Sequence, residues 1–213
     1  MSKLHIADID FPRFYTEVFP SFDAAKSFYK QLEDLPPEKN AAKIVFHQAA
    51  RMVWLADQID EVARGRPAFQ VLFYLIAAEL VAKITFNFEG EGESRKYVRR
   101  FFAEICSNDT RAKLAKSFSK TRSGPLSSQD AVDLLYNIRC DVAHEGKYSS
   151  FHLPLPGDAF PQLTIVGDES FVAHLTIQEL RRMILEGALL ASHKLLNEAA
   201  AGGSSMAAAA PWT

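Results

Sequence analysis

Cysteine, an excess of charge of one sign, and long unbroken apolar runs are all scarce in this chain of 213 residues. Its two cysteines, Cys106 and Cys140, are too few for a disulfide framework or a four-ligand zinc site, and they favour a reducing compartment. The formal net charge of −2 excludes a protein that is basic throughout, but it leaves room for a local basic face. We therefore expect a cytoplasmic globular protein without a metal or other cofactor.

The most apolar stretch, residues 67–88, is interrupted by Gln70, Glu79 and Lys83. Its longest strongly apolar run, Val71–Ala78, is far shorter than the ~20 residues that cross a bilayer. The first residues carry acidic side chains where a signal peptide needs an apolar run. The sequence thus predicts no membrane partner.

Helical periodicity dominates the rest of the chain. Apolar residues recur at helical spacing over a long segment that opens near Pro37 and closes at Gly65, and the next segment is apolar on nearly all sides, as in the central helix of a bundle. Glu79, inside that central helix, requires a partner if it is buried. Further helices are predicted at about residues 22–32, 93–106, 109–118 and 127–146, and after Thr176, which forms a capping box with Glu179.

Residues 160–175 differ from these helices, because they predict two short strands around Gly167 and Asp168. The expected fold class is therefore all-α, a helical bundle with a small β-hairpin insertion before the C-terminal helix. The expected division of the chain is an N-terminal extension at 1–35, a helical domain at 36–199 with its β insertion at about 160–175, and a low-complexity tail at 200–213.

One segment is strongly basic within this slightly acidic protein. Between residues 95 and 122, only Glu104 and Asp109 oppose nine basic residues. Clustered cations neutralise phosphates and release counterions, so this segment favours nucleic-acid binding without base preference. The expected RNA-binding residues are Arg95, Lys96, Arg99, Arg100, Arg111, Lys113 and Lys116. A solvated basic face of no special function is the alternative.

A second stretch, "LLYNIRCDVAHEG" at residues 134–146, carries the strongest chemical signal. It places Arg139 and His144 five positions apart near a helix end that Gly146 can close. The helix dipole favours a protonated histidine in the last turn, and Asp141 can hold its ring. Such a histidine can exchange protons near neutral pH, while the arginine offers a fork of donors to a phosphoryl oxygen.

This stretch resembles the Arg-x4–6-His signature of the HEPN superfamily, particularly its Apea-like branch, in which an "R…vH.G" pattern ends a core helix. The resemblance is sharp over about 13 residues and loose over about residues 37–199. It implies a helical bundle that acts as a homodimer, with two such motifs facing each other. In many active members an Asn, Asp or His follows the arginine, whereas this chain has Cys140 there and Asp141 one position later.

The resemblance implies a metal-independent endoribonuclease of toxin or anti-phage systems, with RNA as its substrate and an antitoxin or regulatory protein as a possible partner. Arg139 would stabilise the charge that develops on the scissile phosphate, and His144 would transfer protons, with Asp141 and Cys140 as auxiliary residues. The expected products carry 2′,3′-cyclic phosphate and free 5′-hydroxyl ends. The alternative is a catalytically silent HEPN domain that binds RNA or a protein, and a third is a docking protein whose basic face binds an acidic partner.

The same residues have other interpretations. Cys140 and His144 share a helix face, as a thiolate nucleophile and its base or half a metal site would, but no third residue completes either. Arg139 can instead be an ion-pair partner, for example of Glu79. Tyr148 can touch a base or cover the end of the bundle.

The remaining aromatic residues are assigned mainly to packing. Tyr97, Phe101 and Phe102 can stack on bases, but they more simply form the buried stripe of their helix. Two histidines, His47 and His193, are expected to be half-buried or solvated rather than ligands. For His152 the sequence indicates no position.

Overall fold

The computed structural model describes residues 15–37, 40–62, 65–88, 90–155, 157–158 and 160–202. Residues 1–14 of the N-terminal extension and residues 203–213 of the predicted tail, with its Trp212, lie outside these ranges. Over the described residues the protein is mostly helical, with one small antiparallel sheet. The expectation of a helical bundle is confirmed at this level.

The helices follow the predicted periodic segments closely. A short 3-10 helix, η2, spans Tyr15–Glu17. In chain order the α-helices are α2 (Phe22–Glu33), α3 (Ala41–Val62), α4 (Pro67–Thr85), α5 (Ser94–Arg100), α6 (Asn108–Leu114), α7 (Ser128–Cys140) and α8 (Ile177–Gly202). Two π-helical turns extend α5 and α7, namely η4 (Phe101–Ile105) and η5 (Asp141–Glu145).

Capping residues explain where several helices begin. The Ser21 hydroxyl accepts a hydrogen bond from the Ala24 amide at the start of α2. Thr176 and Glu179 form the predicted capping box of α8, since each side chain accepts a hydrogen bond from the other residue's backbone amide, at 3.2 and 2.9 Å.

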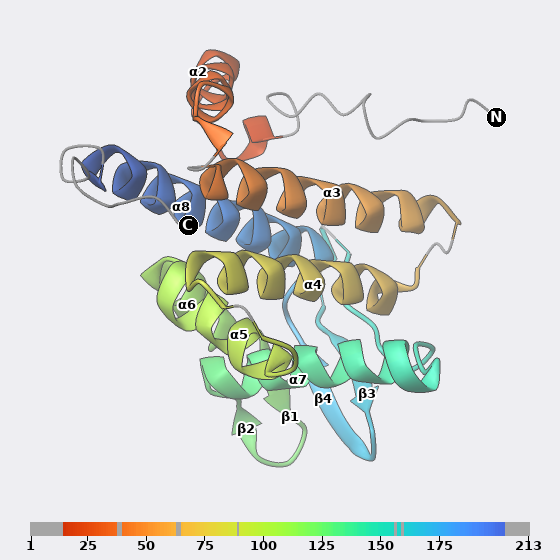
Figure 1. Cartoon of the computed structure of the whole chain (residues 1–213). Coiled ribbons are helices and arrows are strands. Elements are labelled where there is room, and N and C mark those ends of the chain that lie inside the picture. Colours follow the sequence, from red (N-terminus) through yellow and green to blue (C-terminus); the bar gives the residue numbers. More distant parts are fainter. Residues whose placement is uncertain are drawn as a thin grey trace.

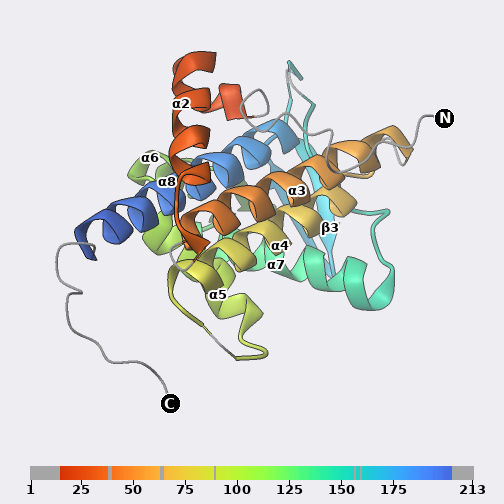
Figure 2. The same cartoon turned by 45° about the horizontal axis from the view of Figure 1, so that its top comes forward.

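Helix α4 is the centre of the bundle. It contacts α3, α8, α7 and α5, and in Figure 1 the long helices α3 and α8 lie on one side of it while α7 and the sheet lie on the other. In the turned view of Figure 2, α2 runs across α8 and comes down to the beginning of α3. Helix α4 is the one described helix long and apolar enough to span a membrane, but 61% of its most apolar window is buried inside the protein. Burial on nearly all sides explains its composition without a bilayer.

The sheet is larger than predicted. The expected hairpin is present as β3 (Gln162–Val166) and β4 (Glu169–Ala173), which pair antiparallel. In addition, β1 (Phe118–Lys120) pairs with β4, and β2 (Gly124–Pro125) pairs with β1. The prediction of a helix as far as residue 118 and a loop after it was therefore wrong. Phe118 is buried because its strand aligns with β4, more than 50 residues away in sequence.

Two particular contacts join the last helix to the rest. The Arg181 guanidinium donates to both carboxylate oxygens of Asp57, at 3.0 and 2.9 Å, and so joins α8 to α3. Gly187 of α8 lies against the π-helical turn η4, where an added Cβ would stand 2.4 Å from the ring of Phe101. The absence of a side chain at this position permits the close approach of the two elements.

Candidate functional site

Helix α7 carries the Arg139–His144 stretch and is fixed at both ends. At its start, the Ser127 hydroxyl accepts from the Asp130 amide at 3.1 Å. One face of the helix is buried against α4 through Ala131, Leu135 and Ile138. This face places the following turn at the edge of the bundle, beside the beginning of α4.

The last turn, η5, is wider than an α-helical turn. The Asp141 carbonyl accepts hydrogen bonds from the amides of Gly146 and Lys147, instead of from residue 145 as in an α-helix. Gly146 closes the turn at φ 63°, a left-handed conformation that glycine adopts at little cost. A π-helical turn holds more residues than an α-helical turn, and because η5 covers part of the interval, Arg139 and His144 diverge less around the axis than they would in a regular α-helix.

Arg139 points inward to Glu79, the carboxylate in the middle of α4. One oxygen of Glu79 accepts from Lys83 at 2.8 Å and from Ser94 at 2.7 Å, and the other lies 3.4 Å from Nη2 of Arg139. Glu79 is 9% exposed, so these donors offset the cost of burying its charge. The expectation that Glu79 is a buried, paired carboxylate is confirmed, and Arg139 is one of its partners, as the ion-pair interpretation of that arginine expects.

The ion pair leaves Arg139 incompletely bonded. Its Nε is buried and has no hydrogen-bond partner in the described part of the chain, and its contact with Glu79 is the longest in the group. The guanidinium also lies 5.3 Å from the centre of the Tyr136 ring. Burial raises the pKa of Tyr136, whose hydroxyl interacts with Ser94 and with the half-buried thiol of Cys140. The fold therefore satisfies the Arg139 guanidinium only in part, and its Nε is shielded from solvent.

His144 lies on the exposed side of η5. No described residue makes a hydrogen bond or ion pair with its ring, and no described contact joins it to Arg139 or to Asp141. Asp141 is half-buried, and its pKa is raised by burial first and then by the nearby charge of Glu145. Within one copy of the chain, His144 is thus exposed to solvent, whereas Arg139 lies against the bundle.

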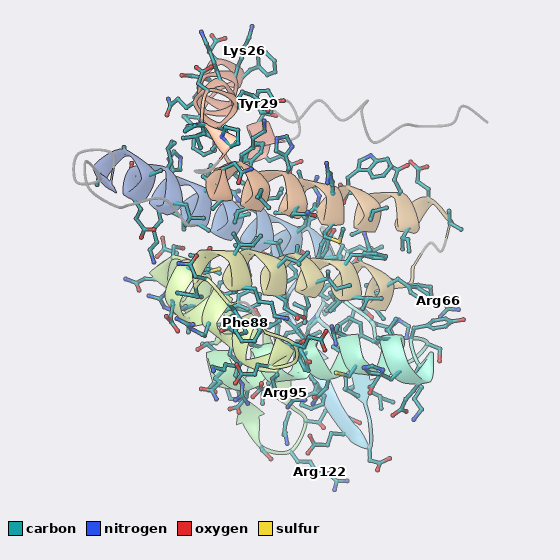
Figure 3. All side chains as sticks on the ribbon, in the orientation of Figure 1. Lys26, Tyr29, Arg66, Phe88, Arg95 and Arg122 are labelled. Atoms are coloured by element: carbon teal, nitrogen blue, oxygen red, sulfur yellow. The ribbon has the colours of Figure 1, made fainter. Side chains whose placement is uncertain are left out.

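An aromatic and cationic pair that the sequence did not indicate lies beside η5. The Tyr148 ring packs on Phe69 at 4.7 Å, and the exposed guanidinium of Arg66 lies 5.6 Å from its centre. Figure 3 shows the labelled Arg66 at the beginning of α4, near the end of α7. Tyr148 covers the end of the bundle, as one interpretation predicts, yet it stays 37% exposed. Sequence signals for Arg66 were absent because it lies in the turn before α4, 78 residues away from His144.

Most of the predicted RNA-binding residues are occupied by partners from elsewhere in the fold. Ion pairs link Lys96 to Glu93, Arg99 to Asp133, Arg100 to Glu104, and Lys113 to Glu179. Arg95 donates to Asn137, and Arg111 donates to the carbonyls of Ala103 and Cys106. Of the seven, Lys116 alone is exposed without a partner among the described residues. The four ion pairs reduce the positive charge of the segment, whereas Arg95 and Arg111 keep their charge because these acceptors are neutral.

The other candidate residues lie apart from this site. Tyr97, Phe101 and Phe102 are buried, so their assignment to the packed stripe is confirmed. His47 lies on α3 and His193 packs on Phe28 at 4.3 Å, both remote from α7. Within the described ranges no three His, Cys, Asp or Glu side chains gather as a metal site would require.

Comparison with known proteins finds no match. No family model matches the sequence, and neither a curated protein nor a solved structure is similar to it. Any statement about function must therefore rest on the residues and geometry described above.

Proposed function

We propose that this protein is a metal-independent endoribonuclease of HEPN type that acts as a homodimer in the cytoplasm. The observation that carries the proposal is the widened turn η5, which begins two residues after Arg139, contains His144 and is closed by Gly146. π-helical turns inside α-helices occur frequently at functional sites. A further feature supports it, namely the exposed ring of His144, which no described residue holds by a hydrogen bond or ion pair.

The chemistry requires few groups. His144 takes the proton of a ribose 2′-hydroxyl as the O2′–P bond forms, and a second His144, from the partner copy, donates a proton to the departing 5′-oxygen as the P–O5′ bond breaks. Arg139 donates to the phosphoryl oxygens, where negative charge accumulates. The products are a 2′,3′-cyclic phosphate and a free 5′-hydroxyl, with no metal needed for either proton transfer.

The direct test is incubation of the purified protein with mixed single-stranded RNA in EDTA. Cleavage with cyclic phosphate ends is expected, and it should be lost in His144→Ala. His174→Ala is a matched control, because His174 is also exposed but follows β4. Equal cleavage by the wild type and His144→Ala would contradict the proposal, and so would a monomer at micromolar concentration in sedimentation.

A catalytically silent RNA-binding domain is the second candidate, and the Arg139–Glu79 ion pair favours it. In that case, neither protein cleaves RNA, while RNA is still retained with an affinity that falls as salt rises. A regulatory protein that covers His144 would be compatible with both candidates. If this chain neither binds nor cleaves RNA, the docking of an acidic protein partner remains as its function.

A further inference from the structure

Gln70 occupies an unusual position in the central helix. It lies in the first turns of α4, whose other buried residues near it are apolar, and it is only 7% exposed. Among the described residues, none forms a hydrogen bond with its side-chain amide. Neither polar atom of this amide is among the fully buried atoms that lack a partner, so the amide is open to the space beside α4, where a ligand can meet it.

The Gln70 side chain borders a cavity of about 400 Å³. The cavity lies between the beginnings of α4 and α8 and the segment that precedes β3. Its buried apolar wall is formed by Leu153, Pro154 and Ile177. Its polar groups include the side-chain amides of Gln70, Gln162 and Gln178.

The charge of the wall restricts the kind of ligand. The described residues that line the cavity include no lysine and no arginine, and the one carboxylate, Asp158, already accepts from the Leu155 amide at 2.7 Å. His152 is the one described lining side chain that can become positively charged, so a phosphate or carboxylate would find no permanent cation there. A neutral, planar group with hydrogen-bonding edges fits better, because each glutamine presents a donor and an acceptor side by side.

We propose that this cavity binds a nucleobase of the RNA. A glutamine amide can pair bidentately with a base edge, and the apolar wall can cover the faces of the ring. The volume is within the usual range of small-molecule sites, about 300–1,000 Å³. The inference rests on the proposed function for its link to cleavage, but base binding itself requires no cleavage.

One edge of the cavity adjoins Arg66, the partner of Tyr148. Gly65 and Pro67 line the cavity, and Arg66 between them is exposed at its edge. The Arg66 guanidinium, 5.6 Å from the Tyr148 ring, is placed to receive the phosphate of a nucleotide whose base enters the cavity. Tyr148 follows His144 by only four residues, so the pair of Arg66 and Tyr148 is close along the chain to η5.

The test measures binding separately from cleavage. Short 2′-O-methyl homo-oligomers of A, C and U lack the nucleophilic hydroxyl, so they bind without being cut, and nucleoside 5′-monophosphates serve as the free-ligand arm. Isothermal titration compares the wild type with Gln70→Leu, Gln178→Ala and the control Gln129→Leu, which changes an exposed glutamine of α7. Side-chain amide signals in NMR spectra report whether Gln70 itself contacts the ligand.

We expect one oligomer to bind preferentially, and this preference to fall about tenfold in Gln70→Leu but not in Gln129→Leu. Equal affinities for all bases, or a preference that Gln70→Leu and Gln178→Ala both retain, would overturn the inference. Binding of monophosphates but of no oligomer would assign the cavity to free nucleotides and refute its role in RNA recognition. Base-selective binding without cleavage would support the cavity as a base-binding site and contradict the nuclease proposal. Cleavage that depends on His144 but shows no base selection would support the nuclease proposal and contradict base binding in the cavity.

Discussion

Replacing Glu79 with glutamine removes the carboxylate charge that Arg139, Lys83 and Ser94 share, and it keeps the size of the side chain. Arg139 and Lys83 are 18% and 21% exposed, so water compensates only partly for the lost charge. Charge-assisted hydrogen bonds contribute about 1.5–3 kcal/mol each, and loss of a partner from a fully buried pair costs about 3–5 kcal/mol. With partial exposure and a retained amide acceptor, we expect the free energy of unfolding to fall by about 2–3 kcal/mol.

For a domain of this size, that loss corresponds to a decrease in Tm on the order of 4–12 °C. Thermal unfolding followed by circular dichroism measures it, and Glu186→Gln is the control because its i,i+4 pair with Arg182 is largely exposed and is worth only about 0.3–0.5 kcal/mol. A double-mutant cycle with Arg139→Met isolates the pair itself. If Glu79→Gln unfolds within 0.5 °C of the wild type, the assignment of Glu79 as the charge that holds α7 to α4 is wrong.

The same variant separates the two candidate functions. Without the carboxylate, Arg139 gains freedom to meet a phosphate, so RNA affinity should rise and the plot of log affinity against log salt should steepen by about one unit. A less stable protein with unchanged RNA affinity would identify Arg139 as a structural cation only. Filter binding at several salt concentrations distinguishes these outcomes.

Three further outcomes are expected. Burial lowers the pKa of His47, so as pH falls below about 6.5 this histidine is protonated in the unfolded chain before it is protonated in the folded one. The Tm should therefore decrease from pH 7 to pH 5.5, and it should decrease less in His47→Gln. A Tm that rises over this range would contradict the expected direction of the pH dependence. Gly187→Ala should lower the free energy of unfolding, measured by urea titration, by about 1–3 kcal/mol, because the added Cβ would collide with Phe101. This loss is expected even though alanine favours helices more than glycine does. A neutral or stabilising effect would show that the Phe101 ring moves aside. Lys116→Ala should weaken RNA binding more than Arg99→Ala does, because Arg99 is already paired; the reverse order, measured by filter binding in folded variants, would mean that the ion pair opens on RNA.

Local patterns were sufficient for much of the fold. Apolar periodicity located α2, α3, α4 and α8, and the capping box of Thr176 and Glu179 formed as its spacing predicts. These features depend on residues within a few positions of each other, so the sequence displays them directly. Strands β1 and β2 were missed because their pairing depends on β4, which the chain reaches much later.

The candidate site divides in the same way. The position of Arg139 and His144 at a helix end closed by Gly146 was visible in the sequence. The widening of that end into a π-helical turn was not, nor was the neighbourhood of Arg66 and Tyr148, because both depend on how α7 meets α4.

By itself, then, the sequence determined which segments are helical, where their caps lie, and which short stretch carries an arginine and a histidine near a helix end, because these follow from neighbouring residues. Only the tertiary structure decided which charged side chains are paired and which residues line the cavity. Arg139 faces a carboxylate 60 residues away, and Arg99 pairs with Asp133, 34 residues away. Only packing brings such side chains within reach, and in a partly buried setting that proximity determines whether a cation remains available to a ligand.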